Sequence, residues 1–473
     1  MILETLVSRM STMFRTKTIA ELMEHCEGES GLRRVIQPWE LLLLGIGGII
    51  GTGIFVITGM AAANYSGPAL VISFVIAGIA CILAALCYAE FAGMVPVAGS
   101  AYTYCYASMG EVWAWIIGWD LILEYSVSVS VVGVGWSAYV VHLLSEAGVM
   151  LPPAFVNPPG VGEGIVNLPA VGIILVITGV LVLGMKESAR LNSLIVLLNV
   201  SVIGLFLFLT SGHVSTINWT PFMPFGWIGV FSGAAIVFFA YVGFDSVLAA
   251  AEEVENPQKN LPRCIIGSVI IVMILYVAVA AMLTGVIPYY LLRDTGAPVA
   301  FALDYIGVSW GAAVLSTGAL CGMTSVILVT LYGQTRIFFA MARDGLLPRA
   351  LGDLHPFSGT PVNVTLLVGC ATALAAGFLP LDPIAELVNI GALAAFVIVA
   401  AGVLILRRTR PEIRRPFRCP LVPLIPVLCI IVSALLIVVL SPETLFRFLV
   451  WLGIGLAIYF AARIRTAEKT VPS

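Results

Sequence analysis

The sequence contains few charged residues for its length. Of 473 residues, 10% are Asp, Glu, Lys or Arg, whereas 60% are apolar and the mean hydropathy is +1.06. Soluble globular domains carry about 25% charged residues, so this inventory cannot build a water-exposed surface. The composition therefore excludes most soluble enzyme folds and indicates a membrane protein.

Three other features are missing. The 23 basic residues do not exceed the 26 acidic ones, so the charge excess of a nucleic-acid-binding protein is absent. The nine cysteines form no C-x-x-C pair, and we read them as buried thiols. The four histidines, His25, His142, His213 and His355, lie far apart in the sequence without metal-ligand spacing. Because no nucleophile signature occurs either, we expect no metal, no cofactor and no enzymatic activity.

The sequence does have a succession of long apolar runs. A helix needs about 20 residues to cross a bilayer, and continuous runs favour helices over the alternating strands of a membrane barrel. We therefore expect an all-α polytopic membrane protein with twelve transmembrane helices. They are placed at residues 39–63, 68–94, 111–143, 167–185, 191–210, 227–251, 264–287, 310–340, 362–379, 384–406, 420–440 and 443–462.

The distribution of basic residues supports this count. If residues 1–38 form a cytoplasmic arm and residues 463–473 a cytoplasmic tail, 21 of the 23 Lys and Arg lie on the cytoplasmic side. Only Arg293 and Arg447 remain outside, as the positive-inside rule requires. The arm has no apolar core before a small-residue cleavage site, so we expect no signal peptide.

The first apolar run contains a predicted break. Five glycines fall between residues 45 and 53, and each costs a helix about 1 kcal/mol relative to alanine. Unwound backbone within a membrane is tolerated where it lines a cavity. The alternative is a close-packing helix face through Gly47 and Gly51. A nucleotide-binding loop does not fit, because no strand precedes the glycines and no lysine follows them.

The sixth run contains a second predicted break, at Gly243 and Asp245. The two breaks occupy equivalent places in two five-helix halves, residues 39–210 and 227–406, which a helix pair at 420–462 follows. Paired interrupted helices indicate a transporter of inverted repeats with its site at the membrane midplane.

The chemistry of such a site follows from the backbone. A helix that restarts near Thr52 and Gly53 presents its first amides to an anion. Carbonyls from Phe238 to Val242, where the first half of the sixth helix ends, accept hydrogen bonds from an ammonium group. A carboxylate and an ammonium group together describe an α-amino acid.

Several sequence strings carry a family resemblance. They are GIGGIIGTGIF, ALCYAEFAGMVPVAGSAYTYCY, WDLILEY, FFAYVGFD, EEVENPQKNLP and YGQTRIFFAMARDGLLP. Together they resemble the amino acid–polyamine–organocation superfamily, and more narrowly its cationic amino acid transporter family with that family's bacterial homologues, over residues 30–463. The resemblance implies two inverted five-helix repeats with helices 1 and 6 broken, two extra C-terminal helices, and alternating access for amino acids.

The resemblance also implies a set of site residues. The substrate carboxylate would contact the amides of Ile49, Ile50, Gly51, Thr52 and Gly53, and the ammonium group the carbonyls of Phe238, Phe239 and Val242. Phe239 would cover the substrate as an aromatic lid, with plain core packing as the alternative.

Two positions depart from parts of the family and bear on mechanism. Asn199 stands where a helix 5 lysine serves proton coupling in some members, and the cationic transporters resemble this chain in carrying asparagine there. Coupling through a lysine is therefore not expected. Thr330 stands where some relatives with small-substrate pockets carry methionine, and the smaller side chain leaves room for arginine, lysine or ornithine.

Carboxylates inside a membrane are costly and therefore informative. Asp120 and Glu124 are four residues apart and share one helix face. Glu124 is interpreted as a counter-charge or titrating group, or alternatively as a protonated acid bonded to Tyr276. Asp245 either carries protons or caps the second half of helix 6.

A further set of charged residues is expected near the cytoplasmic helix ends. It forms an inner gate or a structural network in which Arg336 and Arg343 pair with Glu90, Glu252, Glu253 and Glu255.

These expectations combine into a function. The chain is predicted to move cationic amino acids across the plasma membrane, by uniport or exchange, with both termini cytoplasmic. The alternatives are a proton-coupled symporter of small neutral amino acids such as alanine, an amino acid or polyamine exchanger, and a membrane sensor. The expected partners are the substrate and the lipid bilayer, a small single-span accessory peptide remains open, and the sequence does not give the oligomeric state.

Overall fold

The structure is a computed structural model, and it describes residues 36–95, 100–184, 189–293, 295–353, 355 and 360–469. The predicted arm at residues 1–38 lies almost wholly outside the described residues. Within them the chain is helical, and its only β pairing is an isolated bridge between Ile36 and Val254. The all-helical prediction is therefore confirmed for the described part.

Most of the helices overlap the predicted apolar runs, whereas the short helices at 100–108 and 298–305 lie between those runs. In the first half of the chain the helices are α3 (Pro38–Ile49), η1 (Gly53–Ile57), α4 (Thr58–Ala61), η2 (Ala62–Ser66), α5 (Leu70–Met94), α6 (Ser100–Ser108), α7 (Glu111–Glu146), α8 (Leu168–Val182) and α9 (Ala189–Thr210). In the second half they are α10 (Gly226–Val237), η7 (Phe238–Tyr241), η8 (Phe244–Glu253), α11 (Pro257–Val286), α12 (Pro298–Tyr305), α13 (Ser309–Arg343), α14 (Val362–Phe378), α15 (Leu381–Thr409), α16 (Leu424–Val439) and α17 (Pro442–Lys469).

Seven helical stretches in the described residues are long and apolar enough to cross a membrane, and five apolar helices are shorter. Large apolar side chains also face outward: Phe208, Ile228 and Val438 are 76%, 82% and 79% exposed. An apolar surface of this kind suits lipid rather than water. The chain is thus built as a multi-pass membrane protein, while the count of twelve spans, the inverted repeat and the domain boundaries stay predictions.

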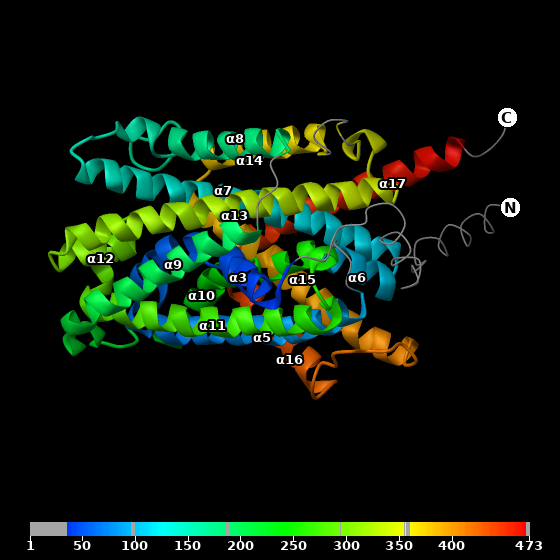
Figure 1. Cartoon of the computed structure of the whole chain (residues 1–473), viewed down its shortest axis with the longest axis horizontal. Helices are drawn as coiled ribbons and strands as arrows, with labels where there is room; N and C mark the ends of the chain where they lie inside the picture. Colours follow the sequence, from blue (N-terminus) through cyan, green and yellow to red (C-terminus); the bar gives the residue numbers. More distant parts are fainter. Residues whose placement is uncertain are drawn as a thin grey trace.

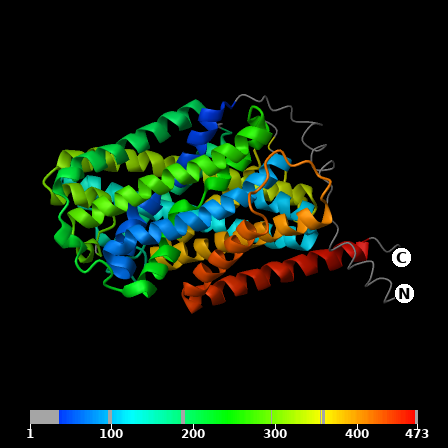
Figure 2. The same cartoon turned by 90° about the horizontal axis from the view of Figure 1, so that it is seen from below.

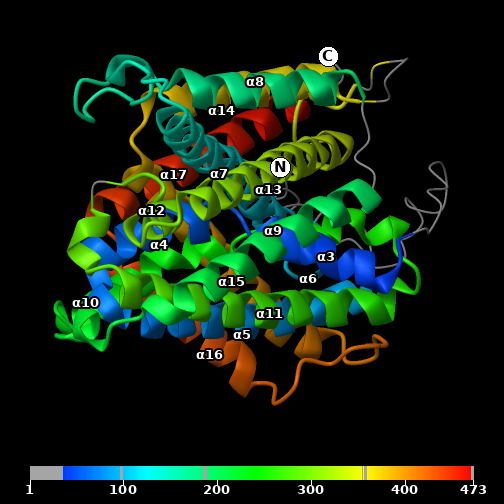
Figure 3. The same cartoon turned by 60° about the vertical axis from the view of Figure 1, so that its left-hand side comes forward.

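The long helices run side by side along the longest axis of the molecule (Figure 1). Helices α8 and α14 form one edge with α7 beneath them, α5 and α11 lie on the opposite side, and α3, α10 and α15 lie between, in views from two directions (Figures 1 and 3). This arrangement encloses the two helices that the sequence predicts to be broken.

Helix α17 lies along one edge of the bundle (Figure 2). Two indoles fasten it to α7: Trp119 and Trp451 stack with ring centroids 4.5 Å apart. The Nε1 of Trp119 donates to the carbonyl of Trp451 at 2.9 Å, and the Nε1 of Trp451 donates back to the carbonyl of Trp119 at 3.1 Å. Each indole therefore buries its apolar face and satisfies its single donor.

Candidate functional site

The first apolar run is interrupted where its glycines predict. Helix α3 ends at Ile49, Ile50 is extended with φ −75° and ψ 97°, and helical hydrogen bonding resumes at Gly53. The amide of Ile50 donates to the carbonyl of Ile46 at 2.9 Å. That amide is paired within the end of α3, so its predicted contact with a carboxylate requires correction. A helix that begins at Gly53 leaves its first amides without an intrahelical acceptor, which suits an anion.

The sixth run is interrupted as well. Helix α10 ends at Val237, the short turn η7 follows, Val242 is extended with ψ 138°, and η8 begins after Gly243. Gly243 has φ +108°, a backbone conformation that residues other than glycine rarely adopt. The chain therefore changes direction at this glycine.

The two interruptions lie against each other. A Cβ placed on Gly243 would lie 2.4 Å from the carbonyl oxygen of Gly48, and one placed on Gly53 would lie 2.3 Å from the Cα of Ala240. Both distances are far shorter than a van der Waals contact, so only glycine allows this approach. The glycines thus bring the end of α3 and the end of η7 to one place.

A cavity of about 30 Å³ lies at this place. That volume holds about two water molecules, so a substrate as large as an amino acid requires the surrounding helices to move. The lining residues are Gly48, Ile49, Gly51, Thr52, Gly53, Glu124, Tyr125, Ser128, Val132, Phe239, Val242, Gly243, Asp245, Val326 and Thr330. The structure thus gathers most of the predicted site residues from segments far apart in the sequence.

Four of the predicted site residues do not line the cavity. The ring of Phe238 packs edge-on against Phe396, with centroids 5.5 Å apart. Ile50 is fully buried. Asn199 is buried in α9 beside Gly322, and its Oδ1 has no hydrogen-bond partner among the described residues. Tyr276 lies on α11 and contacts the backbone of the broken helix.

The position of Tyr276 corrects one expectation. Its hydroxyl donates to the carbonyl of Ile49 at 3.0 Å, whereas the sequence analysis considered a bond to Glu124. Ile49 is the last residue of α3, and its carbonyl has no partner farther along that helix. Tyr276 therefore stabilises the break instead of neutralising the acid.

Two carboxylates face the cavity. Glu124 and Asp245 are 5% and 7% exposed, and Tyr125 donates from its hydroxyl to Oδ2 of Asp245 at 3.3 Å. No lysine or arginine lies among the described lining residues of this cavity. Two acids at a cavity suit a cationic group of a substrate or a proton.

Asp120 and Asp245 lie in different settings. Asp120 lies one turn before Glu124, outside the cavity lining, and neither of its oxygens has a hydrogen-bond partner among the described residues. Asp245 is the second residue of η8, and the residue at the N-cap of that helix is Gly243. The proton and capping alternatives for Asp245 both stay open.

Several polar side chains that the sequence did not single out hold the broken helices. Asn389 on α15 donates from Nδ2 to the carbonyls of Ala235 and Ile236 at 2.8 and 3.2 Å. Tyr139 on α7 donates to the carbonyl of Phe55 in η1 at 2.8 Å. The available signal was a polar residue within an apolar run, as Asn389 is.

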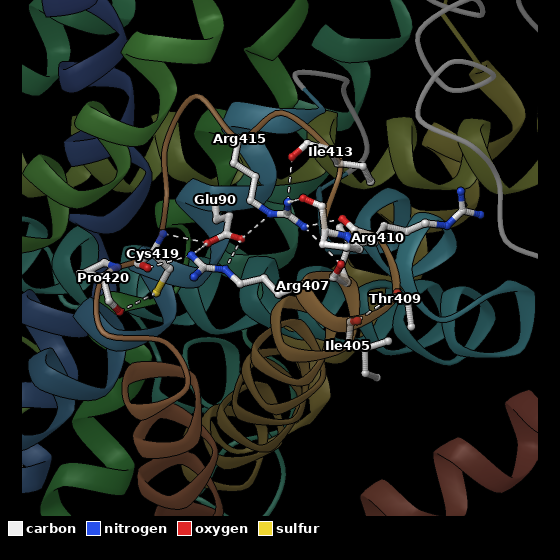
Figure 4. A network of polar contacts seen from close by, with 11 residues as sticks. Glu90, Ile405, Arg407, Thr409, Arg410, Ile413, Arg415, Cys419 and Pro420 are labelled. Carbon is white, nitrogen blue, oxygen red and sulfur yellow. Dashed lines mark hydrogen bonds and ion pairs between the residues drawn. The ribbon is translucent and has the colours of Figure 1, made fainter.

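The predicted cytoplasmic network forms with different partners (Figure 4). Arg407 donates to both oxygens of Glu90, at 3.0 Å from Nε and 2.6 Å from Nη2, and Nε of Arg415 lies 3.2 Å from Oε1. The amide of Cys419 also donates to Glu90, at 2.8 Å. The acid is completely buried. The expected pairing of Glu90 with Arg336 or Arg343 is therefore wrong.

Three other members of that predicted network also have contacts other than those expected. Arg336 donates to the hydroxyl of Tyr332, and Arg343 lies over the ring of Phe339. Glu255 accepts from the amide of the Gln37 side chain at 2.8 Å. The side chain of Glu252 lies outside the described residues.

Sequence comparison identifies the family. The sequence model of the amino acid permease family matches residues 36–459. The chain is 50% identical over 452 residues to a branched-chain amino acid permease of Bacillus subtilis, covering 95% of this chain and 97% of the relative. It is 47% identical to the methylthioribose transporter of the same organism, covering 95% and 98%. It is also 38% identical to a vacuolar cationic amino acid transporter of Arabidopsis thaliana, covering 82% of this chain and 65% of that one. The chain therefore belongs to the amino acid permease family of the amino acid–polyamine–organocation superfamily, and its relatives are transporters, not enzymes.

Proposed function

We propose that this permease carries α-amino acids by alternating access, with the substrate head group held between the two interrupted helices. The observation that carries the proposal is the contact of the two breaks around one cavity, with Gly53 against Ala240 and Gly243 against Gly48. The amides at the start of η1 bind the carboxylate, and the carbonyls of Phe239 and Val242 accept from the ammonium group.

We propose branched-chain apolar amino acids as the substrates. The cavity wall beyond the two breaks includes Val132, Val326 and Phe239, which suit an apolar side chain. Two relatives support this assignment, at 50% and 34% identity, because each is a branched-chain amino acid permease. Thr330 also lines the cavity, and its small side chain leaves room for more than alanine.

Cationic amino acids are the second candidate. Glu124 and Asp245 both line the cavity, so each acid lies where the basic side chain of a substrate needs a counter-charge. The plant relatives at 38% identity support this candidate as well. For either substrate class, we propose the plasma membrane as the location, with cytoplasmic termini, and uniport or exchange instead of coupling through a lysine.

Uptake into liposomes tests both candidates. Purified protein is reconstituted, and the uptake of labelled leucine, arginine and alanine is measured with and without a pH gradient. We expect saturable leucine uptake that isoleucine and valine inhibit at least tenfold more strongly than arginine or methylthioribose. Faster uptake of arginine than leucine favours the second candidate, and strong inhibition by methylthioribose alone rejects both.

A further inference from the structure

Three side chains converge where the C-terminal end of α7 meets α12. They are His142 and Glu146 on α7 and Asp304 on α12, and one nitrogen or oxygen atom of each lies within 4.8 Å of the others. Nε2 of His142 lies 3.0 Å from Oδ2 of Asp304. Histidine spacing alone did not reveal this group, because its other two members are carboxylates.

The geometry of the group matches a transition-metal site. His142 and Glu146 are four residues apart on one helix and share a face, and Asp304 supplies a third ligand from a second element. Zinc binds imidazole nitrogen and carboxylate oxygen at about 2.0–2.2 Å, so tetrahedral ligands lie about 3.3 Å apart. Nε2 of His142 and Oδ2 of Asp304, 3.0 Å apart, are close to this separation. Glu146, exposed at the end of its helix, has only a short distance to move.

Two polar atoms of this group have no partner in the described part of the chain, and of these Oδ1 of Asp304 is the unused ligand atom, because one imidazole binds one ion through one nitrogen only. Nδ1 of His142 and Oδ1 of Asp304 are buried atoms without a hydrogen-bond partner among the described residues. The side chains of these two residues nevertheless keep 16% and 21% of their surface exposed, so an ion can reach them from solution. Imidazole is a poor ligand for calcium or magnesium and a good one for zinc and its neighbours.

The group connects elements that enclose the broken first helix. Tyr139, three residues before His142, holds the carbonyl of Phe55 in η1. Helix α12 packs against α4, which follows η1. A Cβ placed on Gly59 of α4 would lie 2.4 Å from Cβ of Pro298, the first residue of α12. Helix α12 lies at the end of the long axis opposite to α6 and the C-terminal end of α17 (Figure 1). In the predicted topology this end faces the outside.

We propose that His142, Glu146 and Asp304 form an external binding site for a first-row transition-metal dication such as zinc, and that the bound ion slows transport by tying α7 to α12. The ion fixes both helices against η1 and α4, which must move for a cavity of about 30 Å³ to admit an amino acid. Its effect on transport rests on the proposed function, whereas its binding does not.

Binding is tested first, with zinc chloride and the purified full chain in detergent, by titration calorimetry and by the metal content after dialysis. We expect one zinc ion per chain in the wild type and at least tenfold weaker binding in His142→Ala and Asp304→Asn. Glu146→Gln, at an exposed position, weakens zinc binding without a risk to folding. His142→Cys retains the zinc binding that His142→Ala loses, because a thiolate also binds zinc. His213→Ala and Glu443→Gln, which alter other residues on the same predicted side, bind as the wild type does. Equal binding by the wild type and by His142→Ala overturns the proposal.

Transport is tested second, with zinc added outside proteoliposomes. We expect at least threefold slower leucine uptake in the wild type, reversal by a chelator, and no effect on His142→Ala. Zinc that binds at these residues but leaves uptake unchanged overturns the proposed effect of the ion on transport. A wild type that binds zinc and transports no amino acid at all contradicts the proposed function and leaves the metal site standing.

Discussion

The hydroxyl of Tyr276 donates to the carbonyl of Ile49 at 3.0 Å, across 227 residues of sequence. Ile49 is the point at which α3 stops, so this bond satisfies one of the carbonyls that the break releases. Tyr276 is fully buried and packs against the rings of Phe74 and Tyr241. The interruption is thus held from α11 by a residue that does not touch the cavity.

Tyr276→Phe removes this bond and keeps the ring. The carbonyl of Ile49 then lacks a partner in a buried place, at a cost of about 1–3 kcal/mol. We expect the melting temperature and the rate of leucine uptake both to fall, the latter by about fivefold or more. Tyr290→Phe, at a residue that is 62% exposed, is the matched control and should change neither. Unchanged uptake by Tyr276→Phe would show that the bond does not hold the break in its active form.

Gly243 is expected to tolerate no side chain. Gly243→Ala combines an unfavourable φ of +108° with a Cβ 2.4 Å from the carbonyl of Gly48. We expect transport to fall at least tenfold. Gly160→Ala, at φ +86°, also lies beyond the usual left-handed region but meets no atom within 4 Å, so it separates strain from contact. Similar losses in both variants would mean that the contact between the two broken helices is unimportant.

Thr330 is expected to control the size of the substrate. It lines the cavity from α13, and Thr330→Met fills space that a long side chain needs. We expect the uptake of leucine and arginine to fall several-fold more than that of alanine. Thr317→Met, at an exposed position on the same helix, is the control for the larger side chain. A proportionate loss for all three substrates would contradict this role.

The charge of Glu124 distinguishes the two substrate classes. Glu124→Gln keeps the shape of the side chain and removes a group that can carry a negative charge at the cavity. If the acid pairs with basic substrates, arginine uptake falls by tenfold or more while leucine uptake changes little. For a branched-chain permease we expect arginine to be a poor substrate both before and after the change, and leucine uptake to change little. Uptake of both amino acids, each measured across a pH gradient, decides between these outcomes.

Helix positions could be predicted because they depend on local sequence. The runs at 68–94 and 362–379 match α5 (Leu70–Met94) and α14 (Val362–Phe378), since an apolar run of this length has few alternatives to a helix. The two breaks were also predictable. Glycine lowers helix stability by about 1 kcal/mol wherever it stands, and five glycines cluster at the first break.

Side-chain partners could not be predicted in the same way. The bond of Asn389 to Ala235 spans 154 residues, and that of Arg407 to Glu90 spans 317. Such pairs depend on which helices touch, and apolar runs of similar composition do not encode this choice locally. Arg336 and Arg343 were plausible partners for Glu90 by charge alone, and only the packing of α15 beside α5 selects Arg407.

The polar contacts around Glu90 order the loop between α15 and α16 (Figure 4). Arg415 donates to the carbonyls of Ile413 and Arg410 at 2.8 and 3.0 Å, while Glu90 holds Arg407 and the amide of Cys419. This single acid therefore joins both ends of the loop to α5.

Glu90→Gln leaves two guanidinium groups facing a neutral side chain. Breaking a buried ion pair from one side costs about 3–5 kcal/mol, so the loop should detach before the helices unfold. We expect trypsin to cleave after Arg414 or Arg418 at least tenfold faster than in the wild type, with a lower melting temperature. Glu412→Gln removes an exposed acid from the same loop and should leave the cleavage rate unchanged. Equal cleavage rates in Glu90→Gln and the wild type would mean that the loop is ordered by Arg415 and its backbone contacts alone.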